Sequence, residues 1–185
     1  MYLPAGISVC PGCGGPLALA SATLYHCDGC GRVFDIEYDQ ADYHILSWVS
    51  DTLAVGSLAQ AQNPQILELE KVGSLLSCRD PEPGPCREFA DRCEFAPLKD
   101  GKPIPDGYLQ RVTDWLIYRL RCQQRILVYC AAGQSRSVTV AAVTMVRMGL
   151  ADTFDRAVET IRDVRPKASP HPVLRQSARA YLHER

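Results

Sequence analysis

Apolar and polar residues alternate along this chain with two periods, one typical of strands and the other typical of helices. Short apolar runs bounded by Gly, Pro or charged residues predict strands at residues 51–56, 73–78, 92–96 and 125–129. Apolar residues three or four positions apart predict helices at residues 63–70, from 108 onward, and at 138–148, 152–164 and 173–183. Strands that alternate with helices favour an α/β fold with a central, mostly parallel sheet flanked by helices.

Residues at the ends of these segments predict where the helices begin and end. Asp106 lies just before the helix that starts at residue 108, and Asp152 starts the next-to-last helix, so both are predicted N-caps. Pro166 ends the latter helix. Residues 138–148 are apolar nearly all round, which predicts a buried central helix.

The segment from Cys130 to Ser137 carries the clearest chemistry. It joins a predicted strand to the buried helix through five small or polar residues, Ala131, Ala132, Gly133, Gln134 and Ser135. The inward-facing amides of such a loop, with the helix N-terminus, form a cradle for an anion. Arg136 can bind two phosphate oxygens as a planar fork, and its charge is expected to hold Cys130 as a thiolate. A thiolate aimed at a bound phosphate predicts a phosphatase; a buried structural cysteine is the alternative.

Four features of residues 45–183 occur in the order typical of one protein family. The motif Cys130-x5-Arg136-Ser137 is preceded by a glycine–serine turn at 53–57, a core strand at 72–78 and an aspartate-containing segment at 95–100. Together they resemble the cysteine-dependent protein phosphatases, most closely the compact dual-specificity branch. The resemblance implies a dual-specificity-phosphatase-like domain over residues 41–185, which hydrolyses phosphate esters through a phosphocysteine and without a catalytic metal.

The resemblance also implies a role for each candidate residue. Cys130 attacks phosphorus, Arg136 stabilises the phosphoryl oxygens, and residues 131–136 bind the phosphate. Ser137 caps the helix, stabilises the leaving thiolate, or does both. Asp100, thirty residues before Cys130, resembles the family's general acid. A plain Asp-Gly turn is the alternative interpretation of Asp100, and Asp106 is a rival acid better explained as a helix cap.

Two further residues bear on the activity. Tyr129 departs from the family's pattern, which has a His immediately before the nucleophile that helps to keep the thiolate. The departure leaves open a slower enzyme, or a module that binds phosphate and hardly turns over. Cys78 resembles the cysteine with which several relatives trap the nucleophile as a disulfide, although a small buried residue is an equal alternative. The remaining cysteines of this region, Cys86, Cys93 and Cys122, are treated as incidental.

The first forty residues predict a separate module. Two knuckles, Cys10-x2-Cys13 and Cys27-x2-Cys30, supply the four thiolates of a tetrahedral, structural zinc site. With short strands expected at 17–20 and 33–36, residues 1–40 resemble a zinc ribbon that folds around one zinc ion. Two disulfides are the alternative, and His26 is either a spare ligand or a surface residue. Whether the ribbon recruits a protein partner, contacts nucleic acid or only stabilises the chain stays open.

Composition narrows the function classes. The chain has 185 residues and a formal net charge of −1, so no basic face indicates nucleic acid. Its longest apolar stretch, residues 138–150, contains Arg147 and is too short to cross a membrane, and the N-terminus shows no secretory signal. Nine cysteines without such a signal favour a reducing compartment, so we expect a cytoplasmic protein.

The loop also bears on the substrate. Residues 131–135 contain no Lys or Arg, although related lipid phosphatases often place basic residues there, so an inositide is disfavoured. The expected substrate is a phosphoprotein that carries phosphotyrosine, phosphoserine or phosphothreonine. Two alternatives stay open: a weakly active phosphate-binding module, and a phosphatase for a nonprotein substrate.

Overall fold

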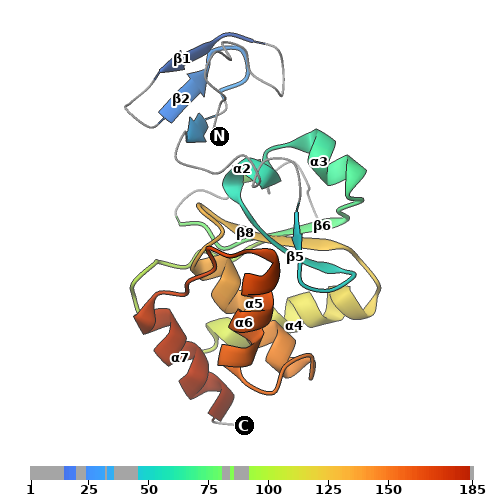
Figure 1. Cartoon of the computed structure of the whole chain (residues 1–185), viewed down its shortest axis with the longest axis vertical. Coiled ribbons are helices and arrows are strands. Elements are labelled where there is room, and N and C mark those ends of the chain that lie inside the picture. The colour runs from blue at the N-terminus through green and yellow to red at the C-terminus, as the bar shows by residue number, and fades with distance from the viewer. Residues whose placement is uncertain are drawn as a thin grey trace.

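The computed structural model describes residues 15–19, 24–31, 33–35, 46–80, 84–85 and 92–183. These residues form a small three-stranded sheet near the N-terminus and a five-stranded sheet with helices on both faces (Figure 1). None of the helices in these ranges is long and apolar enough to span a membrane.

The small sheet is an antiparallel meander of β1 (Leu17–Leu19), β2 (Leu24–Cys27) and β3 (Val33–Asp35), and it confirms the two strands expected there. Strand β2 ends at Cys27, and the turn that follows carries Cys30. It is closed by Gly31, whose N–H donates to the carbonyl oxygen of Cys27 at 2.8 Å. Gly31 has a φ of +69°, which is the left-handed geometry expected of a knuckle. Cys10 and Cys13 lie outside the described residues, so the four-thiolate site stays a prediction.

The five-stranded sheet has the order β4-β5-β8-β6-β7. Four strands are parallel: β5 (Leu53–Ser57), β8 (Ile126–Cys130), β6 (Ser74–Ser77) and β7 (Cys93–Phe95). The short edge strand β4 (Ser47–Trp48) runs antiparallel to β5. The predicted mostly parallel sheet is therefore confirmed.

Helices cover the two faces of this sheet unequally (Figure 1). One face packs against a layer of four helices: α4 (Tyr108–Arg121), α5 (Arg136–Arg147), α6 (Phe154–Val164) and α7 (Pro172–His183). The other face carries the shorter α2 (Leu58–Ala61) and α3 (Pro64–Leu69). Helix α5 is buried along most of its length, as its apolar sequence predicts.

The central strand β8 divides its side chains between these two layers. Ile126, Val128 and Cys130 lie in the core beneath α4–α7, whereas Leu127 and Tyr129 lie in the core beneath α2 and α3. Successive side chains of a strand point to opposite faces, so the position before the nucleophile cannot face the same layer. Cys130 and Tyr129 consequently lie in different environments.

The structure corrects both predicted aspartate caps. The N-cap of α4 is Gly107, with a φ of +72° and no side-chain cap hydrogen bond, so Asp106 does not cap that helix. The N-cap of α6 is Thr153, not Asp152; the Thr153 hydroxyl accepts a hydrogen bond from the Arg156 N–H at 3.3 Å. In each case the residue after the aspartate occupies the non-helical position from which a cap must act.

Candidate active site

Cys130 is the last residue of β8, at the carboxyl end of the parallel strands, and its side chain is only 2% exposed. Hydrogen-bond donors from the loop and from α5 point at its sulfur. The N–H of Gly133 lies 3.2 Å from Sγ, and the hydroxyl of Ser137, in the first turn of α5, lies 3.3 Å from Sγ. Both donors stabilise a negatively charged sulfur more than a neutral thiol.

Burial by itself raises the pKa of the Cys130 thiol, because it removes water from the thiolate. The hydrogen bonds from the hydroxyl and N–H of Ser137, the charge of Arg136 and the N–H of Gly133 outweigh that effect. The pKa of Cys130 is therefore lowered below its ordinary value. Tyr129 lies on the opposite face of β8 from Cys130, in the core beneath α2 and α3.

The loop between Cys130 and Arg136 is shaped by a close backbone approach at Gly133. This glycine has a φ of +67°, and a Cβ atom there would lie 2.6 Å from the carbonyl oxygen of Gly56 and 2.4 Å from Nη2 of Arg165. Only glycine fits such a position without displacing backbone. The turn brings the N–H of Gly133 back toward Cys130.

A residue that sequence reasoning missed, Arg165, holds the outer side of this loop. Arg165 is 1% exposed, and its guanidinium donates to the carbonyl oxygens of Gly133, at 2.5 Å from Nε, and of Ala132, at 2.9 Å from Nη2. The same side chain reaches Ser47 Oγ at 3.2 Å and Gln60 Oε1 at 3.5 Å. In the sequence, an arginine before Pro166 at the end of a helix is indistinguishable from an ordinary surface cation.

Asp100 is brought to the same loop. Its Oδ1 accepts hydrogen bonds from the hydroxyl of Ser135 at 2.7 Å and from the N–H of Gly101 at 3.2 Å. The Ser135 hydroxyl accepts in turn from the N–H of His171 at 3.0 Å. The side chain of Asp100 is 46% exposed, which leaves it accessible to a bound substrate. The rival, Asp106, is exposed and does not line the hollow described below.

Arg136 is oriented for an anion. Its side chain is 13% exposed, and Nη1 donates to the carbonyl oxygen of Leu98 at 3.4 Å. Among the described residues no group accepts a hydrogen bond from its buried Nε, which lies 3.9 Å from Oδ2 of Asp100. A buried guanidinium N–H that lacks an acceptor is suited to a phosphate oxygen.

These side chains surround one hollow of about 350 Å³, whose lining is Asp100, Cys130, Ala132, Gln134, Ser135, Arg136, Ser169, Pro170, His171 and Pro172. The other candidate residues do not line the hollow. Gly133 and Ser137 donate hydrogen bonds to the sulfur of Cys130, and Ala131 is exposed. Sequence reasoning did not predict segment 169–172 at this site, because the segment follows a helix more than thirty residues after the nucleophile.

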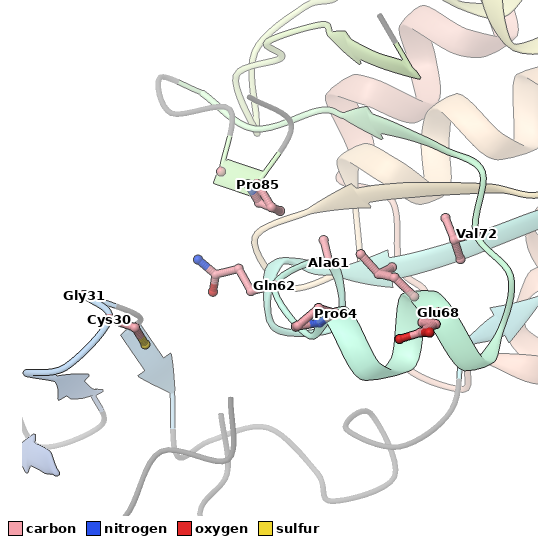
Figure 2. A pocket seen from close by; sticks show the side chains of 10 residues that line it. Cys30, Gly31, Ala61, Gln62, Pro64, Glu68, Val72 and Pro85 are labelled. Carbon is pink, nitrogen blue, oxygen red and sulfur yellow. The ribbon is translucent and has the colours of Figure 1, made fainter. Parts of the chain in front are cut away.

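A larger hollow of about 660 Å³ lies elsewhere, beside α2 and α3 and across from the turn that carries Cys30 (Figure 2). Glu68 supplies a carboxylate to its lining and Cys30 an exposed thiol, but none of the candidate catalytic or phosphate-binding residues takes part. Size alone therefore does not identify the reactive site, since the candidate catalytic residues line the smaller hollow at Cys130.

The other cysteines differ in state and position. Cys78 is fully buried just after β6, and its N–H donates to the carbonyl oxygen of Tyr129 at 2.8 Å. Burial, together with the nearby Cys130, raises the pKa of Cys78 well above its ordinary value, whereas the pKa of Cys130 is lowered. A Cys78–Cys130 disulfide stays a prediction, which mass spectrometry after mild peroxide tests. Cys93, treated above as incidental, is disulfide-bonded.

The chain is similar to dual-specificity protein phosphatases in sequence and in fold. Dual specificity protein phosphatase 1 of Arabidopsis thaliana is 28% identical over 142 residues, which are 76% of this chain and 70% of that protein. The crystal structure of DUSP15 superposes with a TM-score of 0.67 at 21% identity, covering 74% of this chain and 86% of the other.

The crystal structure of PTPMT1 in complex with PI(5)P superposes with a TM-score of 0.58 at 17% identity, over 74% of this chain and 93% of the other. The chain matches no family model. At these identities the structural likeness concerns the fold, and it confirms the expected dual-specificity-phosphatase-like architecture with its mixed sheet and flanking helices.

Proposed function

We propose that this chain, which shares the fold of dual-specificity phosphatases, is a phosphoprotein phosphatase acting through a phosphocysteine. One observation carries the proposal: a buried thiol of lowered pKa, Cys130, shares a hollow with a guanidinium, Arg136, and a carboxyl group, Asp100. These are the nucleophile, the anion-binding group and the acid that transfer of a phosphoryl group to sulfur requires.

In the first step the Cys130 thiolate attacks phosphorus in line with the ester oxygen. Arg136 and the loop amides bind the three non-bridging oxygens and stabilise the charge that they carry in the transition state. The bond from phosphorus to the ester oxygen breaks, and that oxygen takes the proton of the Asp100 carboxyl group. Because Ser135 donates to Oδ1 of Asp100, Oδ2 is the oxygen left to hold that proton.

In the second step water cleaves the phosphocysteine. The Asp100 carboxylate takes a proton from the water as the water oxygen bonds to phosphorus, and the sulfur–phosphorus bond breaks. The departing sulfur becomes a thiolate, which the Ser137 hydroxyl stabilises from 3.3 Å. Inorganic phosphate leaves and the enzyme returns to its starting state.

The proposed substrate class is inferred from the side chains of the phosphate-binding loop. Residues 131–135 carry no cationic side chain that would meet the additional phosphates of an inositide. The alternative of a nonprotein substrate is motivated by the shared fold with PTPMT1, whose complex contains PI(5)P. Hydrolysis of phosphopeptides compared with phosphoinositides under the same conditions decides between them. We infer that the substrates are proteins that carry phosphotyrosine, phosphoserine or phosphothreonine.

The N-terminal knuckle fits one half of a zinc site. Cys27 and Cys30 lie three positions apart around a single tight turn closed by Gly31. With Cys10 and Cys13 they would hold one zinc ion, which supplies folding free energy to the ribbon and takes no part in the phosphoryl transfer. We propose that the ribbon binds a protein partner and does not contact the reacting groups.

Hydrolysis of p-nitrophenyl phosphate by the full chain, by Cys130→Ser and by the control Cys122→Ser tests the proposal. Cys122 is a free, exposed cysteine remote from the hollow. Turnover is expected in the wild type and the control, with and without a chelator, and is expected to vanish in Cys130→Ser. Folded wild type without turnover at neutral and mildly acidic pH would instead support the phosphate-binding module.

A further inference from the structure

A second hollow adjoins the active site. It has a volume of about 500 Å³, and its lining is Ser169, Pro170, Pro172, Arg175, Gln176 and Arg179. Ser169, Pro170 and Pro172 also line the hollow that contains Cys130. A substrate whose phosphate sits over Cys130 can therefore continue across this proline-containing segment onto helix α7.

The far side of this second hollow is positively charged. Arg175 and Arg179 lie four positions apart on α7, and so on one face of the helix. Both bind the same carboxylate of α6: Arg175 Nη1 lies 3.2 Å from Oδ1 of Asp155, and Arg179 Nη2 contacts Oδ2. Two guanidinium groups thus share one carboxylate, so among the described residues their two positive charges face a single negative charge.

The three charged side chains remain open to solvent, with exposures of 30% for Arg175, 47% for Arg179 and 42% for Asp155. Ion pairs as exposed as these are weak, so a guanidinium can turn from Asp155 to an incoming anion at little cost. Guanidinium groups bind carboxylates and phosphates through paired N–H···O hydrogen bonds.

We propose that this second hollow is a subsite for a negatively charged group that the protein substrate carries beside its phosphorylated residue. The group is the carboxylate of a neighbouring Asp or Glu, or the phosphate of a second phosphorylated residue. The subsite rests on the proposed function and deepens it, because the phosphate loop itself offers no cation beyond Arg136 with which to select a substrate.

The test compares kcat/KM for three phosphopeptides of one length: one with alanines beside the phosphorylated residue, one with glutamates, and one with a second phosphorylated residue. For wild type, kcat/KM is expected to be about fivefold higher for each anionic peptide than for the alanine peptide, because exposed ion pairs contribute little free energy. The preference is expected to shrink as the salt concentration rises. Whichever of the glutamate and doubly phosphorylated peptides has the higher kcat/KM shows whether the subsite binds a carboxylate or a phosphate better.

Three variants assign the preference to these residues. The double variant Arg175→Gln/Arg179→Gln is expected to lose it. Asp155→Asn is expected to increase it, because the carboxylate that competes for both guanidiniums is gone. Arg156→Gln serves as the matched control, since Arg156 is exposed on α6, pairs with Glu159 and lines neither hollow, and it is expected to keep the wild-type preference.

Equal rates for all three peptides in wild type would overturn the subsite and leave the proposed phosphatase intact. A preference that survives in the double variant would overturn it too. If the double variant does not fold, the opposite shift expected of Asp155→Asn still decides. Absence of turnover with p-nitrophenyl phosphate would overturn the proposed function itself, and the subsite with it.

Discussion

Arg165 Nε donates a hydrogen bond to the carbonyl oxygen of Gly133 at 2.5 Å, although the two residues lie 32 positions apart. The contact fixes the orientation of the peptide groups in the phosphate loop, because a carbonyl held on the outside leaves the amides to point inward. The N–H of Gly133 indeed points at Cys130. The end of helix α6 thereby helps to build the anion cradle at the start of helix α5.

Gly133→Ala tests this loop geometry. The added methyl group meets the backbone of Gly56 and the guanidinium of Arg165 at a φ of +67°, so we expect a loss of about 3 kcal/mol or more in unfolding free energy and loss of vanadate binding. Gly149→Ala is the control, because Gly149 has a similar φ of +73° with open space around it. The control should lose about 1 kcal/mol and keep vanadate binding. Equal losses in the two variants would contradict the account.

Ser137→Ala tests the origin of the lowered pKa of Cys130. The Ser137 hydroxyl stabilises the thiolate, so its removal raises the pKa of Cys130. The thiolate is the reactive form, and the ascending limb of the kcat/KM profile should therefore move to higher pH. Alkylation of Cys130 by iodoacetamide should show the same shift. Tyr129→Phe is the comparison variant and should leave the limb in place; a shift in Tyr129→Phe but not in Ser137→Ala would reverse the assignment.

Asp100→Asn tests the general acid. An amide cannot protonate the ester oxygen, so kcat is expected to fall about a hundredfold for phosphotyrosine peptides, while vanadate affinity persists. Substrates with acidic leaving groups, which need less protonation, should lose less. Asp106→Asn changes an exposed aspartate outside the hollow and is expected to retain activity. Unchanged turnover in Asp100→Asn would remove Asp100 from the mechanism.

Metal analysis of the full chain tests the N-terminal site. One zinc ion per chain is expected in wild type and in Cys122→Ser, and less than one in Cys27→Ser and Cys30→Ser, which remove thiolates from the knuckle. Chelation should unfold the ribbon and leave hydrolysis of p-nitrophenyl phosphate in place. A wild-type chain without zinc would favour the disulfide alternative, and activity that disappears with the metal would contradict a structural role.

The sequence predicts the elements that carry a clear period and the residues that share one short loop. Helix α5 and strand β8 are recognisable because apolar residues fill them, and Cys130, Gly133 and Arg136 are recognisable because their spacing is local. Strand β4 is only two residues long and leaves no pattern to read. Arg165 and the segment 169–172 join the site through tertiary contacts, which no local periodicity encodes.

The caps show a second limit of sequence reasoning. Asp106 and Asp152 are good capping residues by type, yet capping depends on which residue holds the extended backbone at the helix start. Thr153 takes that position at α6, with a φ of −140°. At α4 the N-cap is instead Gly107, whose left-handed φ of +72° is strained for most other residues.

Capture of a covalent phosphoryl group on Cys130 tests the central claim most directly. Ser137→Ala should accumulate the intermediate, because the sulfur that departs in the second step has lost its hydrogen bond. The variant would be mixed with a phosphopeptide, quenched in acid within milliseconds, digested and measured by mass spectrometry. The account predicts the added mass of one phosphoryl group on the peptide that contains Cys130. Turnover without that adduct, or an adduct on another residue, would contradict it.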